Sequence, residues 1–353
     1  ICYNQEMDFK LFKTIAETHG VAGREENIRA LAVKLLTPLV DEIRVDALGN
    51  VIGLRKGSKK QPRRIMIAAH MDEIGLAVNY IDDKGFVRFI PAGGIDPRTL
   101  LAQRVFIHTA NGDIPGVIGT KPIHLMDAAE MKQGVGFADL FIDTGMSAAE
   151  TKKTVQFGDT VTLARDTIEM GDCITSKAID DRAGVYAIIS ALRQVKRQES
   201  DIYAVFTVQE EIGLKGATVA AFGVEPEIGL AVDCTAAADV PGNSPQNFAT
   251  SSGGGVAITG RDGRTVSNIK IMRFLKGLAE KHGIAHQIRI ANKGGTDASV
   301  MQLAREGAAV CTLSIPTRYV HSCVETVRKS DMDSAVALLA AFITDCHSLD
   351  CKF

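Results

Sequence analysis

Short apolar runs separated by amphipathic segments constrain the fold of this chain most. Residues 202–208 and 228–232 are apolar runs of the length that buried strands have. Residues 181–195, ahead of them in the chain, carry apolar side chains at helical spacing. Strands that alternate with helices build a largely parallel sheet with helices on both faces. The sequence therefore predicts an α/β fold, with a mostly parallel central sheet flanked by helices.

The same two patterns predict the other elements of this fold. Helical spacing predicts helices over residues 25–40, 214–222, 265–282 and 331–347. Apolar runs predict strands over residues 64–69 and 309–315, and a glycine turn within residues 43–54 predicts a hairpin. The α/β pattern thus extends towards both ends of the chain.

A stretch of different character interrupts this pattern. From about residue 74 to residue 166, short alternating segments follow turns such as Asp83-Lys84-Gly85 and Asn111-Gly112-Asp113. One short helix is predicted there, over residues 147–153. We therefore predict a small β-rich, barrel-like domain at residues 74–166. It is inserted into a larger domain built from residues 1–73 and 167–353.

Composition and charge narrow the classes of function. The formal net charge of -2 gives no electrostatic reason to expect nucleic acid or an anionic membrane as a partner. The chain contains no run of about 18 apolar residues, and residues 1–9 lack the basic and apolar regions of a signal peptide. Its seven cysteines have no CxxC spacing, which indicates reduced thiols. We expect a cytoplasmic protein without a membrane span.

Histidines and carboxylates collect at one position in this predicted fold. Ligands of open parallel sheets bind beyond the carboxyl ends of the strands. Eight side chains follow predicted strands or stand at the start of the helix near residue 181: His70, Asp72, Asp180, Asp181, Glu210, Glu211, Asp233 and His321. So many acids stay ionised side by side only with cations between them. Two histidines with several carboxylates suit zinc, cobalt or manganese, and two such ions with a bridging carboxylate serve hydrolysis.

Each of these residues alone also has an ordinary structural explanation. A histidine that follows a strand is more often structural than metal-binding. Asp180-Asp181 also fits a helix N-terminus, where Asp is common. Glu210-Glu211 also fits a solvated strand end, and Asp233 a turn. Only their joint placement at one edge of the sheet indicates a metal site.

Six ordered motifs around these residues are similar to those of the tetrahedral (TET), or glutamyl-type, aminopeptidases. They are His70-Met71-Asp72-Glu73-Ile74-Gly75, Asp180-Asp181-Arg182-Ala183-Gly184, Gln209-Glu210-Glu211-Ile212-Gly213-Leu214-Lys215-Gly216-Ala217, Val232-Asp233, Gly294-Gly295-Thr296-Asp297-Ala298 and Arg318-Tyr319-Val320-His321-Ser322. The resemblance covers nearly the whole chain. It implies a dinuclear metallo-aminopeptidase that removes N-terminal residues from short peptides. It also implies that the inserted domain serves dimerisation.

The resemblance assigns roles residue by residue. It makes Asp180 the carboxylate that bridges two divalent ions, with zinc expected before cobalt or manganese. It makes four further residues metal ligands: His70, Glu211, Asp233 and His321. Glu210 is implied as the general base, and Asp72 as the acceptor of a hydrogen bond that fixes the tautomer of His70. The family forms homodimers that assemble into tetrahedral homododecamers, which admit short peptides.

Two departures from the family pattern concern substrate specificity. Cys323 stands where the family has proline, and Ser251-Ser252-Gly253-Gly254-Gly255 replaces an expected Leu-Gly-x-Gly-Pro stretch. Neither departure involves a predicted metal ligand. Two other functions stay open on the sequence alone. One is a deacylase or carboxypeptidase with the same metal residues, and the other is a non-catalytic assembly or binding module.

Overall fold

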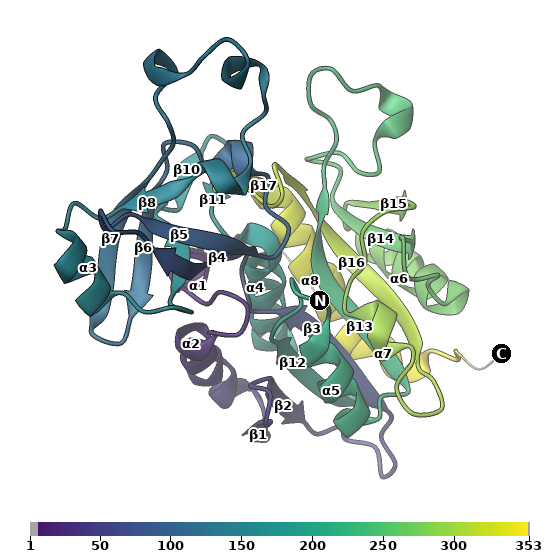
Figure 1. Cartoon of the computed structure of the whole chain (residues 1–353). Coiled ribbons are helices and arrows are strands. Elements are labelled where there is room, and N and C mark those ends of the chain that lie inside the picture. The colour runs from purple at the N-terminus through teal and green to yellow at the C-terminus, as the bar shows by residue number, and fades with distance from the viewer. Residues whose placement is uncertain (1–5, 352–353) are drawn as a thin grey trace.

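A mixed sheet runs through the larger domain of the computed structural model, which describes residues 6–351 (Figure 1). Its main path contains β1 (Glu42–Val45), β2 (Val51–Arg55), β12 (Asp201–Thr207), β3 (Arg64–His70), β13 (Ile228–Ala236), β16 (Ala309–Arg318), β17 (Glu325–Arg328), β11 (Cys173–Ser176) and β10 (Ile168–Met170), in that order. Strand β14 (Val256–Arg261) pairs with β16 and with β15 (His286–Ile290). The central strands β12, β3, β13 and β16 are parallel, and the marginal pairs on the main path are antiparallel. The α/β prediction is confirmed.

Helices cover both faces of this sheet (Figure 1). One face packs against α1 (Phe9–Glu17), α2 (Glu26–Leu36), α4 (Ile179–Gln194), α6 (Ile269–His282) and α8 (Lys329–Asp345), and the other against α5 (Lys215–Val224) and α7 (Ala298–Met301). Successive residues of β3 alternate between these two cores, with Ile65 and Ile67 in one and Met66 and Ala68 in the other. Burial on both faces explains why the strands are continuous apolar runs. None of the helices within residues 6–351 is long and apolar enough to cross a membrane.

Helix α6 begins later than helical spacing alone predicts. The spacing predicts a start at residue 265, but the observed helix starts at Ile269. Asp262 holds a turn before it, because its Oδ1 accepts hydrogen bonds from the N–H groups of Arg264 and Thr265. Asn268 then caps the helix by accepting from two N–H groups of the first turn. Local hydrogen bonds of these polar side chains therefore set the boundary.

A second, smaller sheet closes into a barrel. Its strands are β4 (Gly75–Ile81), β5 (Val87–Ala92), β8 (Phe141–Asp143), β7 (Gly112–Gly119), β6 (Arg104–Thr109) and β9 (Thr160–Leu163), in that order around the barrel. Helix α3 (Ala148–Thr154) lies between β8 and β9 in sequence. The core of the barrel is apolar and separate from that of the larger sheet. All six barrel strands lie within residues 74–166, the segment predicted as an insertion.

Candidate metal centre

Six of the seven predicted site residues line one cavity. They are His70, Asp180, Glu210, Glu211, Asp233 and His321. The cavity has a volume of about 1200 Å³. Strand β3 ends at His70, β12 ends just before Glu210, and β13 carries Asp233 near its carboxyl end. The cavity therefore lies at the carboxyl edge of the parallel strands, where open α/β sheets bind their ligands.

Asp180 lies between the two histidines of this cavity. Its Oδ1 is 3.2 Å from Nε2 of His70, and its Oδ2 is 3.6 Å from Nε2 of His321. The Asp180 side chain is 9% exposed, so water supports its charge only weakly. A carboxylate whose two oxygens face two different imidazoles has the arrangement that a bridging metal ligand needs.

Each histidine also lies near a second carboxylate. Oε1 of Glu211 is 3.4 Å from Nε2 of His321, and Oδ1 of Asp233 is 3.9 Å from Nε2 of His70. The cluster thus divides into two ligand groups that share Asp180. Each group offers one imidazole nitrogen and two carboxylates, a donor set that zinc accepts.

The cluster holds more acidic than basic side chains, so bound cations would stabilise it. Burial, together with the neighbouring carboxylates, raises the pKa of Glu211 and of Asp233 well above the usual range. Burial alone lowers the pKa of His70, but its hydrogen bond to Asp180 and the surrounding acids outweigh this and raise it. The donor set therefore lacks positive charge, and divalent ions supply that charge in sites of this composition. The residues present fit a metal centre.

Asp72 lies beneath the turn that carries Glu210 and Glu211. Its two carboxylate oxygens accept hydrogen bonds from the N–H groups of Glu210 at 3.0 Å and Glu211 at 3.1 Å. Nδ1 of His70 is 3.1 Å from the main-chain oxygen of Asp72 and 3.7 Å from the carboxylate. The expected orienting contact to His70 thus comes from the main chain, because the carboxylate holds the Glu210–Glu211 turn.

The two consecutive aspartates point to different partners, and the peptide bond between them is cis. Asp181 accepts hydrogen bonds from the N–H groups of His70 and Gly184. These bonds tie the start of α4 to the end of β3. Asp180 instead directs both oxygens at the two imidazoles. The geometry favours Asp180 over Asp181 for the bridging role that the resemblance implies.

Sequence reasoning missed Glu325 as a site residue. It is 1% exposed, its Oε2 accepts from the N–H of Asp180 at 2.9 Å, and its Oε1 accepts from the N–H of His321 at 2.7 Å. One carboxylate thus fixes the backbone of both the central acid and the second histidine. The sequence does contain a signal for Glu325. It is an acid at the first position of a strand that contains two β-branched residues, and it comes four positions after His321.

The barrel domain supplies part of the cavity wall through Gly94, and the preceding Gly93 also lies close to a site residue. A Cβ added to Gly94 would lie 3.1 Å from Nδ1 of His321, and a Cβ added to Gly93 would lie 3.2 Å from Oε2 of Glu211. Gly93 also has a φ of +93°, which other residues adopt only with strain. The two glycines therefore let this loop approach the second ligand group closely.

Comparison with known proteins gives the family of the chain. Residues 49–338 match the family model described as M42 glutamyl aminopeptidase. This chain belongs to the M42 glutamyl aminopeptidase family. It is 39% identical to the lysyl aminopeptidase of Pyrococcus furiosus, across 98% of this chain and 99% of that protein. The resemblance inferred from the motifs is confirmed, and this M42 chain is a peptide hydrolase.

Solved structures of other aminopeptidases share its fold. An aminopeptidase from the archaeon Desulfurococcus kamchatkensis is 43% identical, with a TM-score of 0.92, over 95% of this M42 chain and 94% of that one. The TET1 peptidase of Pyrococcus horikoshii is 34% identical, with a TM-score of 0.86, over 95% of this chain and 99% of that one. That Pyrococcus horikoshii peptidase can assemble into a tetrahedron or a large octahedral shell.

Proposed function

We propose that this chain is a dinuclear metallo-aminopeptidase that removes the first residue from short peptides. The observation that carries the proposal is the position of Asp180 between His70 and His321, with a second carboxylate beside each histidine. Two divalent ions, zinc in the first instance, would bind His70 with Asp233 and His321 with Glu211, and Asp180 would bridge them. Bound there, such ions polarise a scissile carbonyl and lower the pKa of a bound water.

Glu210 is proposed as the general base. Its Oε2 is 4.0 Å from Nε2 of His70, and the side chain is 13% exposed to the cavity. Burial raises the pKa of Glu210 to about 8, and two divalent ions bound beside it would lower that pKa, so that the carboxylate could take a proton from water and return it near neutral pH. The proton then passes from Glu210 to the leaving amine of the cleaved bond. The hydrogen bond from its own N–H to Asp72 keeps the turn that carries Glu210 in place.

The basic wall of the cavity supports an acidic first residue in the substrate. Arg289 is 8% exposed, lines the cavity, and has an Nε without a hydrogen-bond partner among residues 6–351. Exposed Arg261, Arg264 and Lys293 add positive charge to the same wall. A buried guanidinium with an unpaired donor favours a carboxylate ligand. The comparisons do not decide this preference, because the family description names glutamyl whereas the Pyrococcus furiosus relative is a lysyl aminopeptidase. The proposed preference for an acidic first residue therefore rests on the charges of the cavity.

Assembly and location complete the proposal. A homo-oligomer, with homodimers built through residues 74–166 and a tetrahedral homododecamer built from them, is proposed on the likeness to the Pyrococcus horikoshii peptidase. Mass photometry tests it: the proposal expects the mass of twelve 37.8 kDa chains, and a monomer mass would contradict it. The cysteines within residues 6–351 are free thiols, which supports a reducing, cytoplasmic location; Cys2 lies outside the described residues.

A substrate panel tests the proposed activity. Chelated and reconstituted protein is assayed on p-nitroanilides of single amino acids and on their N-acetylated counterparts. We expect hydrolysis of free amines only, lost with chelator and restored by a divalent ion. Cleavage of the blocked substrates would instead favour a deacylase, and inactivity of metal-loaded protein on the whole panel would favour a binding module.

A further inference from the structure

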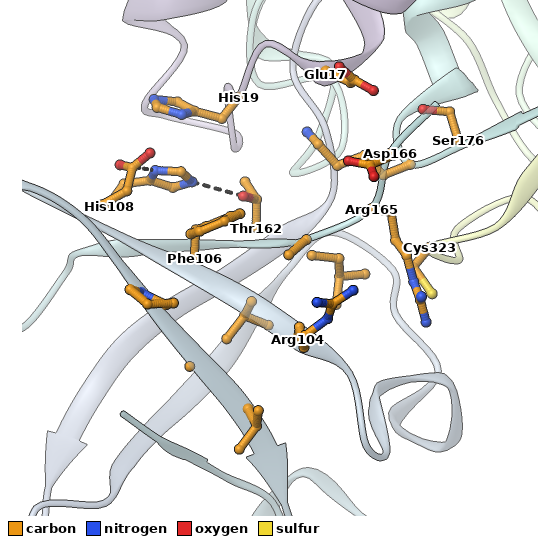
Figure 2. Close-up of a pocket in the computed structure, with 18 of the residues that line it drawn as sticks. Glu17, His19, Arg104, Phe106, His108, Thr162, Arg165, Asp166, Ser176 and Cys323 are labelled. Carbon is orange, nitrogen blue, oxygen red and sulfur yellow. Dashed lines mark hydrogen bonds and ion pairs between the residues drawn. The ribbon is translucent and has the colours of Figure 1, made fainter. Parts of the chain in front are cut away.

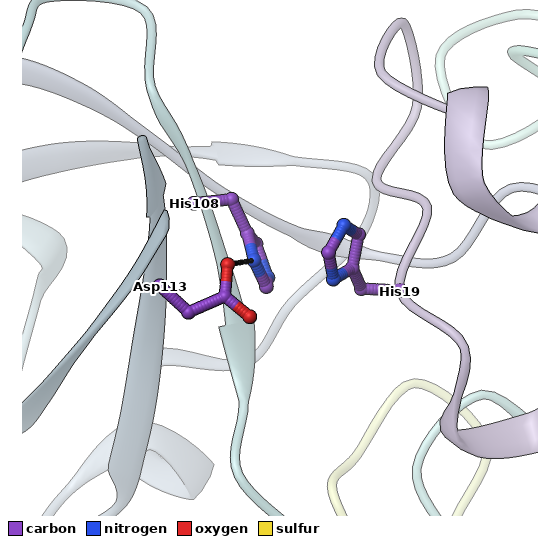
Figure 3. A group of neighbouring side chains, drawn as sticks. All are labelled: His19, His108 and Asp113. Carbon is purple, nitrogen blue, oxygen red and sulfur yellow. Dashed lines mark hydrogen bonds and ion pairs between the residues drawn. The ribbon is translucent and has the colours of Figure 1, made fainter. Parts of the chain in front are cut away.

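A second group of potential metal ligands lies away from the proposed metal centre, where the first helix meets the barrel. His19 follows α1, His108 belongs to β6 and Asp113 to β7, and Figure 3 shows their side chains converging. Each offers one ligand atom, and these atoms all lie within 4.8 Å of one another. We call these three residues the junction cluster. They line a separate cavity of about 960 Å³ between α1 and the barrel (Figure 2).

One of the two neutral tautomers of His108 offers a ring nitrogen to a cation. Its Nε2 is 2.8 Å from Oγ1 of Thr162, and its Nδ1 is 2.7 Å from Oδ1 of Asp113. When Nε2–H donates to Thr162, the lone pair of Nδ1 faces the carboxylate of Asp113. Two acceptors this close repel each other unless a cation lies beside both. An outer hydrogen bond that orients the ring in this way is the usual support of a metal-bound histidine.

His19 completes the group from the larger domain. Its Nε2 contacts the side-chain amide of Asn27. When that amide turns its oxygen towards Nε2–H, the lone pair of Nδ1 is available to a cation. The centre of its ring is 3.7 Å from that of His108, at an angle of 41°.

We propose that His19, His108 and Asp113 form a zinc-binding site that joins the N-terminal segment to the barrel. Two imidazoles and one carboxylate are three zinc ligands, and water reaches the fourth position because the Asp113 side chain is 47% exposed. None of the three residues belongs to the proposed metal centre. Because the ligands come from the segment after α1 and from the barrel, a bound ion would restrain the position of the barrel relative to α1.

The restraint reaches the segment beneath the metal centre. Gly20, next to His19, donates its N–H to Oε1 of Glu73 at 3.0 Å, and its carbonyl accepts from the N–H of Glu73 at 2.9 Å. Glu73 is the neighbour of Asp72, which holds the Glu210–Glu211 turn. An ion on His19 thus stabilises the chain segment that supports this turn. We expect it to raise the temperature at which activity is lost, and to leave the initial rate at moderate temperature unchanged.

Native mass spectrometry of the full chain counts the bound ions after loading with Zn²⁺. We expect His19→Ala and Asp113→Asn each to retain one zinc ion per chain fewer than the wild type. His124→Ala removes an exposed histidine from the same domain and should retain the wild-type number. Equal counts in the wild type and both junction variants would overturn the proposal, because His108 and Asp113 then share only a proton.

Anomalous scattering at the zinc absorption edge is the second measurement, and it needs no substitution. Crystals of the wild-type chain grown with Zn²⁺ should show a peak in contact with all three junction side chains. A peak at His70 and His321 without one at the junction would refute the zinc site and leave the proposed function intact. The reverse result would refute the proposed metal centre alone.

Discussion

Glu210 and Glu211 are adjacent in sequence, but their side chains lie near different histidines. Oε1 of Glu211 lies 3.4 Å from the second histidine, whereas Oε2 of Glu210 lies 4.0 Å from the first. Both main-chain N–H groups bond to Asp72, so the backbone does not distinguish the two residues. In the proposed mechanism, side-chain direction therefore decides which of the two acids would bind metal and which would move a proton.

Replacing Glu210 tests this division of roles. We expect Glu210→Gln to lower kcat by about 10²–10⁴-fold, because an amide cannot take the proton, while the metal content stays at the wild-type value. Steady-state kinetics and elemental analysis on the same sample give both quantities. Glu306→Gln changes an exposed glutamate and serves as the control. Full activity in metal-loaded Glu210→Gln would refute the assignment.

Arg289 is the residue on which the expected specificity depends. We expect Arg289→Gln to lower kcat/KM for a glutamyl substrate by about 10-fold or more, since a desolvated charge pair with the substrate carboxylate is lost. The rate on a leucyl substrate should change little. Arg264→Gln removes an exposed cation from the same wall and should have a smaller effect. Equal losses of kcat/KM on the glutamyl and leucyl substrates would show that Arg289 supports the folded structure and does not bind the acidic side chain of the substrate.

At the scale of elements, the start of α5 is packed directly against the end of β12. A Cβ on Gly216 would lie 2.4 Å from the carbonyl oxygen of Val208 and 2.4 Å from Oδ1 of Asn50. That oxygen of Asn50 accepts a hydrogen bond from the N–H of Val208, just before the Glu210–Glu211 turn. The close approach of helix and strand therefore needs glycine at this position.

We expect Gly216→Ala to destabilise the fold by about 1–3 kcal/mol, the usual range for overpacking in a tight core. Gly277→Ala is a matched control, because Gly277 lies inside helix α6 with no atom within 4 Å of an added Cβ. That change should be neutral or stabilising by up to about 1 kcal/mol. Urea unfolding measures both variants. A Gly216→Ala protein as stable as the wild type would show that the helix moves freely on the strand.

On the scale of the whole molecule, a buried ion cluster ties four segments together. Glu73 follows β3, Lys177 follows β11, and Arg182 lies in α4; their side chains are at most 8% exposed. Nζ of Lys177 is 2.5 Å from Oε2 of Glu73, and Nη2 of Arg182 is 3.6 Å from Oε1. Arg182 also donates to the main-chain oxygens of Ile15 and Thr18 near the end of α1.

Removing the carboxylate takes away the ion-pair partner that the two buried cations share, so we expect Glu73→Gln to destabilise the fold by about 3–5 kcal/mol at pH 7. Burial opposes the charge of Glu73, but Lys177 and Arg182 overcome this and hold its pKa below the usual 4.5. The stabilisation is therefore present above pH 4.5 and is lost as the pH falls through the lowered pKa. Urea unfolding across this range should show the difference between wild type and variant narrowing towards low pH. A constant difference would contradict the electrostatic explanation.

The fold and the location of the candidate site can be predicted well from the sequence, because both follow from the spacing of apolar residues along the chain. Apolar runs locate β3, β12 and β13, and the ends of parallel strands meet at one edge, so His70 and Asp233 follow from the pattern. Side-chain direction does not follow from it. Asp72 supports a turn in preference to an imidazole, and Glu325 accepts a hydrogen bond from the N–H of Asp180, far away in sequence. Such partners exist only after the chain has folded.

The Gly93–Gly94 loop makes the geometry of the proposed metal centre depend on both domains. Although the larger domain contributes every ligand of the proposed metal centre, a loop of the barrel lies against Glu211 and His321 with no room for even a methyl group at ordinary contact distance. A gene shortened to the larger domain would encode a site with one wall missing. A gene that acquired a foreign insert would need two small residues at this same place. A side chain added at either glycine would press on Glu211 or His321, so changes in this barrel loop should alter the proposed metal centre although the loop supplies none of its ligands.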